Sequence, residues 1–280
     1  MNFLKKHKLL FIVLGSLLAI LIVAIILMFT LFSLKTIDVS YASSSATILN
    51  YEEDIKKEIS LGGTVFFKDK SKYINQIEKK YPYIKVVNIE TKIPNKFVLH
   101  LAARQELYAV KVGGKYAILD EELKVLNICD NSNNCIELNV FDLEFSTFEI
   151  GSFVSFNDLS LNENICFNGS DVQNFLTKLY SNFQRNNRNL ENVKSLIKSI
   201  KLETYKDFKD GNIYFCASLF DYNNFETKIC SPNFRLYEKV NSFLFAYADV
   251  CSNSPSKLIT HKLTIIDNKK GEIVCALEEK

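Results

Sequence analysis

The sequence predicts an α+β protein: a single N-terminal transmembrane helix, a compact strand–helix–helix–strand–strand domain, then a larger mixed β-rich domain with two or more helices. Three observations predict this fold class. A long uncharged run lies near the N-terminus, helical and strand-like periodicities then alternate, and strand and turn signals dominate after residue 107. With 48% hydrophobic and 24% charged residues, the chain has an ordinary globular composition, which excludes a mostly disordered protein.

The uncharged run covers residues 9–34. As a helix it would be roughly 39 Å long, enough to cross a hydrocarbon core of about 30 Å with some tilt. Three lysines lie in residues 1–8 and only Lys35 follows closely, so the positive-inside tendency keeps residues 1–8 in the cytoplasm as a short stub. A cleaved signal peptide is the alternative, but its apolar region is typically about 7–15 residues. We therefore expect an uncleaved single-pass anchor that contacts membrane lipid through residues 9–34, with the body of the protein outside the cytoplasm.

Charge gives little support for nucleic-acid binding. The formal net charge is +2, and removing the lysines of the cytoplasmic stub leaves the rest of the chain almost neutral. Such a body lacks the basic footprint that nucleic acid requires, so we expect no nucleic-acid partner.

Residues 35–104 form the first predicted outer domain. Apolar residues recur at helical spacing in two segments, and Gly62-Gly63 ends the first while Asp69 caps the second. Two strands follow, joined by the turn Ile93-Pro94-Asn95. The predicted elements are a strand at 36–40, a helix ending near 59, a helix ending near 80, and strands at 84–90 and 96–101.

Residues 105–277 form the second predicted domain, and residues 278–280 a frayed, solvated tail. A two-glycine turn at Gly113-Gly114 gives a strong hairpin signal, and the clearest helix starts near Asp171. The other predicted elements are a helix at 233–249 and strands at 195–203, 212–219, 225–230, 257–267 and 272–277.

Motifs of enzyme chemistry are absent from the sequence. There is no G-x-S-x-G, H-E-x-x-H, C-x-x-C or phosphate-binding glycine loop, and His100 and His261 have no Cys or acidic partner at ligand spacing. We therefore expect no catalytic, cofactor-binding or metal-binding residues, no cofactor and no small-molecule substrate.

All seven cysteines follow the membrane segment. Thiols of an exported protein can pair. Cys216 and Cys230 would face each other in a hairpin centred on Asn223, and a Cys129–Cys135 bond would close a small loop. Both pairs are predicted disulfides, and the alternative, that most thiols are free and act as small buried hydrophobes, stays open.

Six segments follow one another in a recognisable order. They are Ile37-Asp38-Val39, Gly63–Asp69, Ile77–Lys85, Val87–Leu101, Arg104 with Tyr108-Ala109-Val110, and Tyr116–Asp120. Behind a membrane helix, this series resembles the motifs of the FtsQ/DivIB family of bacterial cell-division proteins. The sequence departs from the family pattern at Tyr83, Ala103 and Glu121-Glu122.

The resemblance implies that residues 35–104 are an FtsQ-type POTRA domain and residues 105–277 the membrane-distal β domain. It also implies a non-enzymatic scaffold at the division septum. Such a scaffold binds FtsL-like and FtsB/DivIC-like single-pass proteins and helps regulate septal peptidoglycan synthesis. The family's partner contact involves the last strand, whose place is taken here by Ile273, Val274, Cys275, Ala276 and Leu277.

Three alternatives stay open at this point. A membrane-anchored POTRA protein for export or envelope assembly would share the first domain. An anchored cell-wall enzyme or thiol oxidoreductase would need a reactive cysteine beside a histidine. A pilin-like subunit fits the outline, although a processing glycine just before the apolar segment is missing.

Overall fold

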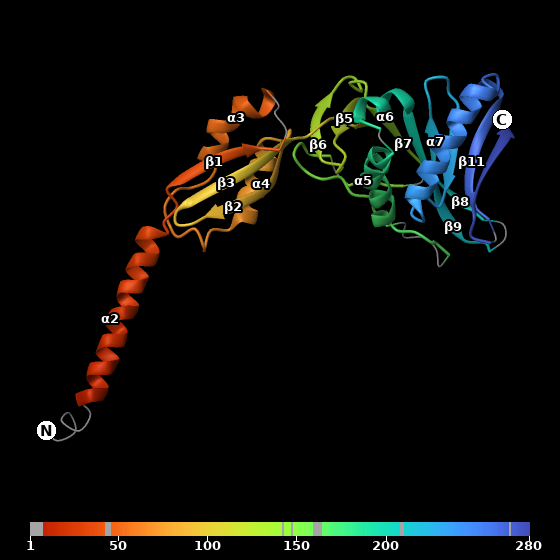
Figure 1. The fold of residues 1–280 in the computed structure, drawn as a ribbon. Helices are drawn as coiled ribbons and strands as arrows, with labels where there is room; N and C mark the ends of the chain where they lie inside the picture. Colours follow the sequence, from red (N-terminus) through yellow and green to blue (C-terminus); the bar gives the residue numbers. More distant parts are fainter. Residues whose placement is uncertain are drawn as a thin grey trace. The chain divides into compact units, whose positions relative to one another are not determined.

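The computed structural model is α+β, as predicted, and divides into two compact units, Met1–Arg104 and Gln105–Lys280 (Figure 1). The predicted cytoplasmic stub lies outside the described residues except for Lys8. The structure describes residues 8–42, 46–141, 143–146, 148–158, 164–186, 188–207, 210–268 and 270–280.

The first unit begins with helix α2 (Lys8–Leu31). Its segment Ile12–Leu31 is the one helix in the described residues that is long and apolar enough to cross a membrane. The hydroxyls of Ser16 and Thr30 donate to carbonyls of the preceding turn, at 2.8 Å each, so the helix satisfies its own polar side chains. This helix is consistent with a membrane anchor.

The rest of the first unit has the predicted strand–helix–helix–strand–strand order. Asp69 caps the second helix as expected, because its carboxylate accepts the N–H of Lys72 at 3.1 Å. The sheet order is β1-β3-β2, with β1 parallel and β2 antiparallel to β3, and the buried side chains of Ile55, Ile77 and Phe97 form its core. The elements are β1 (Thr36–Tyr41), α3 (Ala46–Lys57), α4 (Lys70–Lys80), β2 (Ile84–Lys92) and β3 (Lys96–Ala103).

A buried ion pair ties the end of this unit to its second helix. Arg104 Nη2 donates to Glu78 Oε2 at 2.8 Å, and Glu78 Oε1 accepts the N–H of Val86 at 2.9 Å. Helix α4, strand β2 and the last residue of the unit are thereby held together.

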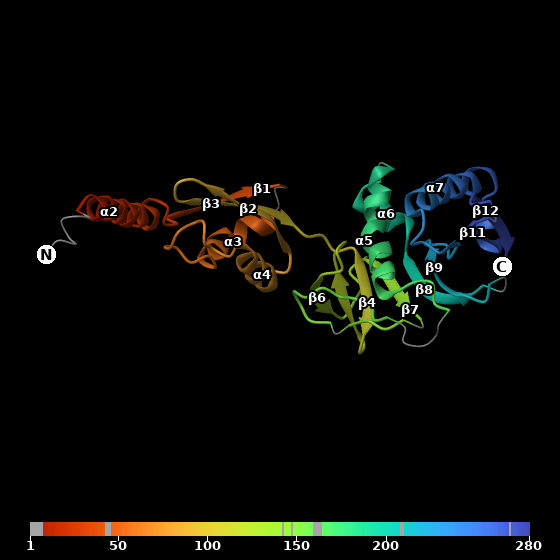
Figure 2. The ribbon, with the colours of Figure 1, turned by 90° about the horizontal axis from the view of Figure 1, so that it is seen from below.

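The second unit is built on one nine-stranded sheet with the order β12-β11-β10-β9-β8-β7-β4-β5-β6 (Figure 2). Neighbours are antiparallel except for β10/β11, β4/β7 and β7/β8, which are parallel. The strands are β4 (Tyr108–Val112), β5 (Lys115–Leu119), β6 (Val125–Cys129), β7 (Ile136–Val140), β8 (Ser199–Lys206), β9 (Ile213–Phe220), β10 (Glu226–Cys230), β11 (His261–Asp267) and β12 (Ile273–Glu279).

Helices α5 (Gly169–Arg185) and α7 (Leu236–Asn253) cover one face of this sheet, with the shorter α6 (Leu190–Leu196) beside α5 (Figures 1 and 2). The apolar stripe predicted on α5 is buried against the sheet. The rings of Phe183 and Phe243 meet edge to face with centroids 6.2 Å apart, which joins α5 to α7.

The C-terminal hairpin differs from the prediction at both of its outer ends. A short helix, α8 (Lys257–Thr260), replaces the start of the predicted strand at 257–267, and β11 begins at His261. The segment predicted as a frayed tail at 278–280 is paired: Glu279 lies opposite His261, and the N–H of Lys280 donates to Thr260 O at 2.9 Å. Strand β12 extends this far because its antiparallel partner offers main-chain groups along its full length.

Candidate partner-binding site

The predicted partner segment, residues 273–277, lies within β12 at one edge of the nine-stranded sheet. Within the described ranges, β12 pairs with β11 alone, so its other side is open. An open edge presents a row of N–H and C=O groups that can accept a further strand.

The hydrogen-bond pattern identifies which residues present these groups. The N–H of Asn268 donates to Glu272 O at 2.8 Å, and the N–H of Lys280 donates to Thr260 O at 2.9 Å. Both bonds join directly opposite residues of the β11–β12 hairpin, and such pairs recur at every second residue of an antiparallel ladder. The main-chain groups of Val274, Ala276 and Glu278 therefore face β11, and those of Ile273, Cys275, Leu277 and Glu279 face the open edge.

Side chains of β12 alternate between the two faces of the sheet. Ile273 and Leu277 pack against the core beneath the helices, and Cys275 Sγ lies 4.0 Å from the carbonyl oxygen of Ser242 in α7. Val274 points to the opposite face, beside Ile266 of β11. One face of the edge strand is therefore anchored to the helical layer.

A fully buried lysine connects the first turn of α7 to the end of β11. Lys239 Nζ donates to the carbonyl oxygens of Cys230 and Ser231 at 2.9 Å each, and lies 2.6 Å from Asp267 Oδ2. Three acceptors thus satisfy the three ammonium protons in the interior. Sequence reasoning missed this residue, although a lysine directly before Val240 on the inward face of a helix was the available signal.

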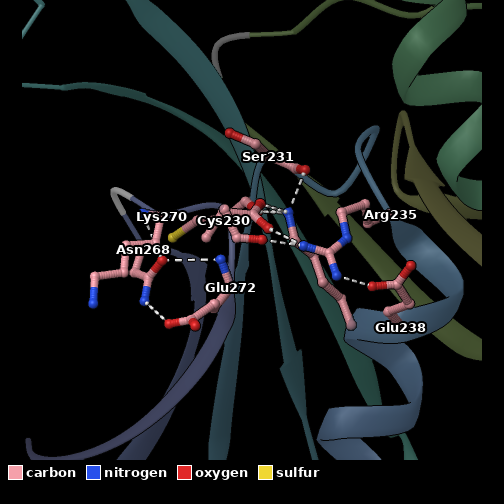
Figure 3. Close-up of polar contacts among 10 residues, drawn as sticks. Cys230, Ser231, Arg235, Glu238, Asn268, Lys270 and Glu272 are labelled. Atoms are coloured by element: carbon pink, nitrogen blue, oxygen red, sulfur yellow. Dashed lines mark hydrogen bonds and ion pairs between the residues drawn. The ribbon is translucent and has the colours of Figure 1, made fainter.

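The turn before β12 is fixed by a second set of contacts, shown in Figure 3. Asn268 Oδ1 accepts the N–H groups of Lys270 and Glu272 at 2.8 and 2.9 Å. Arg235 Nη1 donates to the carbonyl oxygen of Gly271, and Arg235 Nη2 pairs with Glu238. These bonds set where β12 begins and therefore which of its residues face the open edge.

All seven cysteines have free thiols in the structure, so both disulfide assignments stay predictions. Cys216 and Cys230 lie directly opposite each other on β9 and β10. In the neighbouring pair, the N–H of Ser231 donates to Phe215 O at 3.1 Å. Hydrogen-bonded and non-hydrogen-bonded pairs alternate along an antiparallel ladder, so Cys216 and Cys230 form a non-hydrogen-bonded pair. Cα atoms of such pairs are only about 4.5 Å apart, close enough for a disulfide.

The second predicted pair has a different environment. Cys135 is buried and Cys129 packs beside it in a small apolar cluster. Their Sγ atoms lie 3.8 and 3.0 Å from the carbonyl oxygens of Asn133 and Asn131 in the intervening loop. Of the two pairs, Cys216/Cys230 has the better-defined cross-strand geometry.

We expect Cys216 and Cys230 to form a disulfide when oxidised glutathione is added, and the rate to rise about tenfold per pH unit between pH 7 and 9. Burial raises the pKa of Cys216 to about 12 and also raises that of Cys230, against the opposing effect of Lys228. Only a small thiolate fraction, growing with pH, can therefore attack. Peptide mapping by mass spectrometry, with Cys216→Ser as control, measures the pair; random pairing with exposed Cys251 would contradict it.

Each of the two described histidines, His100 and His261, has one polar side-chain neighbour. His100 Nε2 lies 3.2 Å from Glu90 Oε2, and His261 Nδ1 lies 2.7 Å from Thr260 Oγ1. Over the ranges that the structure describes, no group of three or more His, Cys, Asp or Glu side chains could hold a metal ion.

Comparison with known proteins matches the first unit to a domain family. Residues 45–104 match the model of the POTRA domain, FtsQ-type. The chain is 27% identical over 161 residues to the cell division protein DivIB of Clostridium tetani, covering 57% of this chain and 55% of the relative. It is 28% identical over 113 residues to DivIB of Clostridium botulinum strain Hall, covering 39% of this chain and 44% of that relative. The chain thus spans about half the length of the curated relatives it matches.

A helix of membrane-spanning length followed by an FtsQ-type POTRA domain and a larger β-rich unit defines a class of membrane-anchored POTRA proteins. The similarity to DivIB extends beyond the 60 residues of the POTRA match. Together, the FtsQ-type POTRA match and the relatives named DivIB support an FtsQ/DivIB-family protein.

Proposed function

We propose that this protein is a non-enzymatic scaffold of the bacterial division septum. Its cytoplasmic N-terminus would precede a single membrane span, and its two outer units would bind FtsL-like and FtsB/DivIC-like single-pass proteins. Through them it would help regulate septal peptidoglycan synthesis. The relatives named DivIB support the division role, and the open edge of β12 is the observation that carries the scaffold role.

The proposed contact is addition of a partner strand to β12. Main-chain groups of Ile273, Cys275, Leu277 and Glu279 would form the ladder, and such bonds give affinity largely independent of side-chain identity. Exposed edges are usually protected by charge or proline. Residues 273–277 carry neither, and charged residues flank this stretch: Glu272 precedes it and Glu278-Glu279-Lys280 follow it.

Helix α7 would supply an apolar contact beside the added strand. Phe245 is 72% exposed and lies three residues after Ser242, the residue whose carbonyl contacts Cys275. Residues three apart share one side of a helix, so Phe245 lies on the side of α7 that borders β12. A partner strand with an apolar side chain on this face would cover it.

Localisation of a fluorescent fusion in a depletion strain tests the division role. We expect a band at mid-cell and filamentous cells after depletion, because a septal scaffold is needed only where and when division occurs. A fusion lacking β12 but retaining α2 serves as the control for membrane insertion alone. Uniform membrane signal with normal division would contradict the proposal and favour a role in export or envelope assembly.

A further inference from the structure

The loop between α3 and α4 lies directly beside the end of α2. After Leu31, residues 32–34 pair antiparallel with residues 62–65: the N–H of Leu34 donates to Gly63 O, and that of Val65 to Phe32 O, both at 2.9 Å. The loop is therefore fixed by backbone bonds to the first residues that follow the helix.

The turn between β2 and β3 lies at the same end of the domain. The N–H of Lys35 donates to Asn95 O at 2.8 Å, and β1 begins beside the first residue of β3. Phe66 and Ile93, one from each loop, line a single open groove of about 450 Å³. We call residues 61–67 and 92–95 the membrane-facing loops.

Large apolar side chains on these loops are exposed. Leu61 is 61% exposed, Phe66 48%, Phe67 72% and Ile93 67%. The ring of Phe66 lies 5.3 Å from that of Phe32, so the apolar surface of the helix continues onto the first loop. Concentrated exposed apolar area of this kind marks an interaction surface.

The distance to the membrane identifies what covers this surface. The candidate span Ile12–Leu31 has 20 residues. Its length of about 30 Å matches the hydrocarbon core and puts Leu31 at the boundary. Residues 32 and 33 extend at most roughly 7 Å beyond it, within a headgroup zone of about 5–8 Å on each side. Thr64 and Val65 are bonded to these two residues, so the first loop lies at the depth of the headgroups, and Ile93 of the second loop shares a groove with Phe66.

The charges at this end fit lipid headgroups. Lys35 and Lys92 are exposed here, whereas the nearby carboxylates are engaged: Asp69 caps α4 and Asp38 pairs with Lys96. Phenylalanine and leucine beside lysine are the composition of segments that lie in a membrane interface.

We propose that the membrane-facing loops insert into the interfacial region of the bilayer next to α2, with Lys35 and Lys92 contacting anionic phosphates. The POTRA domain then has a second attachment to the membrane besides its helix. This inference needs α2 to cross the bilayer but does not depend on a role in division.

A tryptophan reporter tests this, because the chain contains no tryptophan. The full-length Phe67→Trp variant, or Ile93→Trp as a second reporter, is reconstituted in phosphatidylcholine–phosphatidylglycerol vesicles with and without brominated acyl chains. The matched control is Val87→Trp, on β2 of the same domain and 53% exposed. We expect brominated lipid to quench the emission of the Phe67→Trp variant at least about twofold more than that of the control.

The lipid-composition arms separate the two parts of the proposal. Quenching should weaken in pure phosphatidylcholine and in the Lys35→Glu/Lys92→Glu variant, and equal quenching in all arms would overturn the anionic contact. Flotation with the vesicles shows that α2 has inserted. If brominated lipid leaves the emission of both loop reporters unchanged in these chains, insertion of the loops is overturned. A blue shift without bromine quenching would assign the surface to a second copy of the chain and also overturn it.

Discussion

Replacing Cys275 by proline is expected to weaken binding of the FtsL-like and FtsB/DivIC-like proteins about 10–100-fold while leaving the distal unit folded. The N–H of Cys275 faces the open edge of β12, so proline removes a donor that only an added strand would use. Proline is tolerated in edge strands when its missing N–H faces solvent. Affinity of the full-length chain for purified partners measures the effect.

Two matched variants make this prediction specific. Cys275→Ala removes the same side chain but keeps the N–H, so it should bind the partners within about threefold of the original chain. Val274→Pro removes a donor that faces β11, so it should lower the stability of the hairpin itself. Unchanged partner affinity of the Cys275→Pro variant would contradict strand addition at β12.

Replacing Lys239 by methionine is expected to lower the free energy of unfolding of the distal unit by about 3–5 kcal/mol. The substitution leaves the Asp267 carboxylate and the carbonyls of Cys230 and Ser231 without their common donor. Asp267 is 30% exposed, so water recovers part of the loss and the lower end of this range is expected. Urea titration measures this change in the free energy of unfolding, and hydrogen exchange at the amides of β11 and β12 shows where the stability is lost.

The control for Lys239 is another lysine of the same region. Lys262 pairs with Glu278 across β11 and β12 at 3.5 Å, and the two side chains are 33% and 47% exposed, whereas Lys239 is fully buried. Lys262→Met should therefore change stability by less than about 1 kcal/mol. Equal losses from the two substitutions would mean that the buried contacts of Lys239 contribute no more than a surface pair.

Local patterns predicted the elements whose residues carry their own periodicity or cap. The stripe from Val172 to Phe183 predicted α5, and Asp69 predicted the start of α4. The order of the first unit and the existence of a strand at residues 273–277 followed in the same way. These features depend on neighbours within one or two turns of the chain, which sequence spacing reports directly.

Long-range pairing could not be predicted from the sequence. Strand β7 pairs in parallel with β4 and β8, and β10 pairs in parallel with β11. Strands β5 and β6 separate β4 from β7, and helices separate the other two pairs, so no local signal sets the register. The edge position of β12 follows from that order. The contacts of Lys239 could not be predicted for the same reason. Its three acceptors are Cys230 at the end of β10, Ser231 directly after it, and Asp267 at the end of β11.

Hydrogen exchange at the amides of β12, with and without the partners, tests the central proposal most directly. The proposal predicts that the amides of Ile273, Cys275, Leu277 and Glu279 exchange quickly in the isolated protein and become protected in the complex. Those of Val274, Ala276 and Glu278, already bonded to β11, should change little. The contradicting result is that the complex protects amides elsewhere, such as in the opposite edge strand β6. The amides of β12 would then keep the same alternation of fast and slow exchange as in the isolated protein.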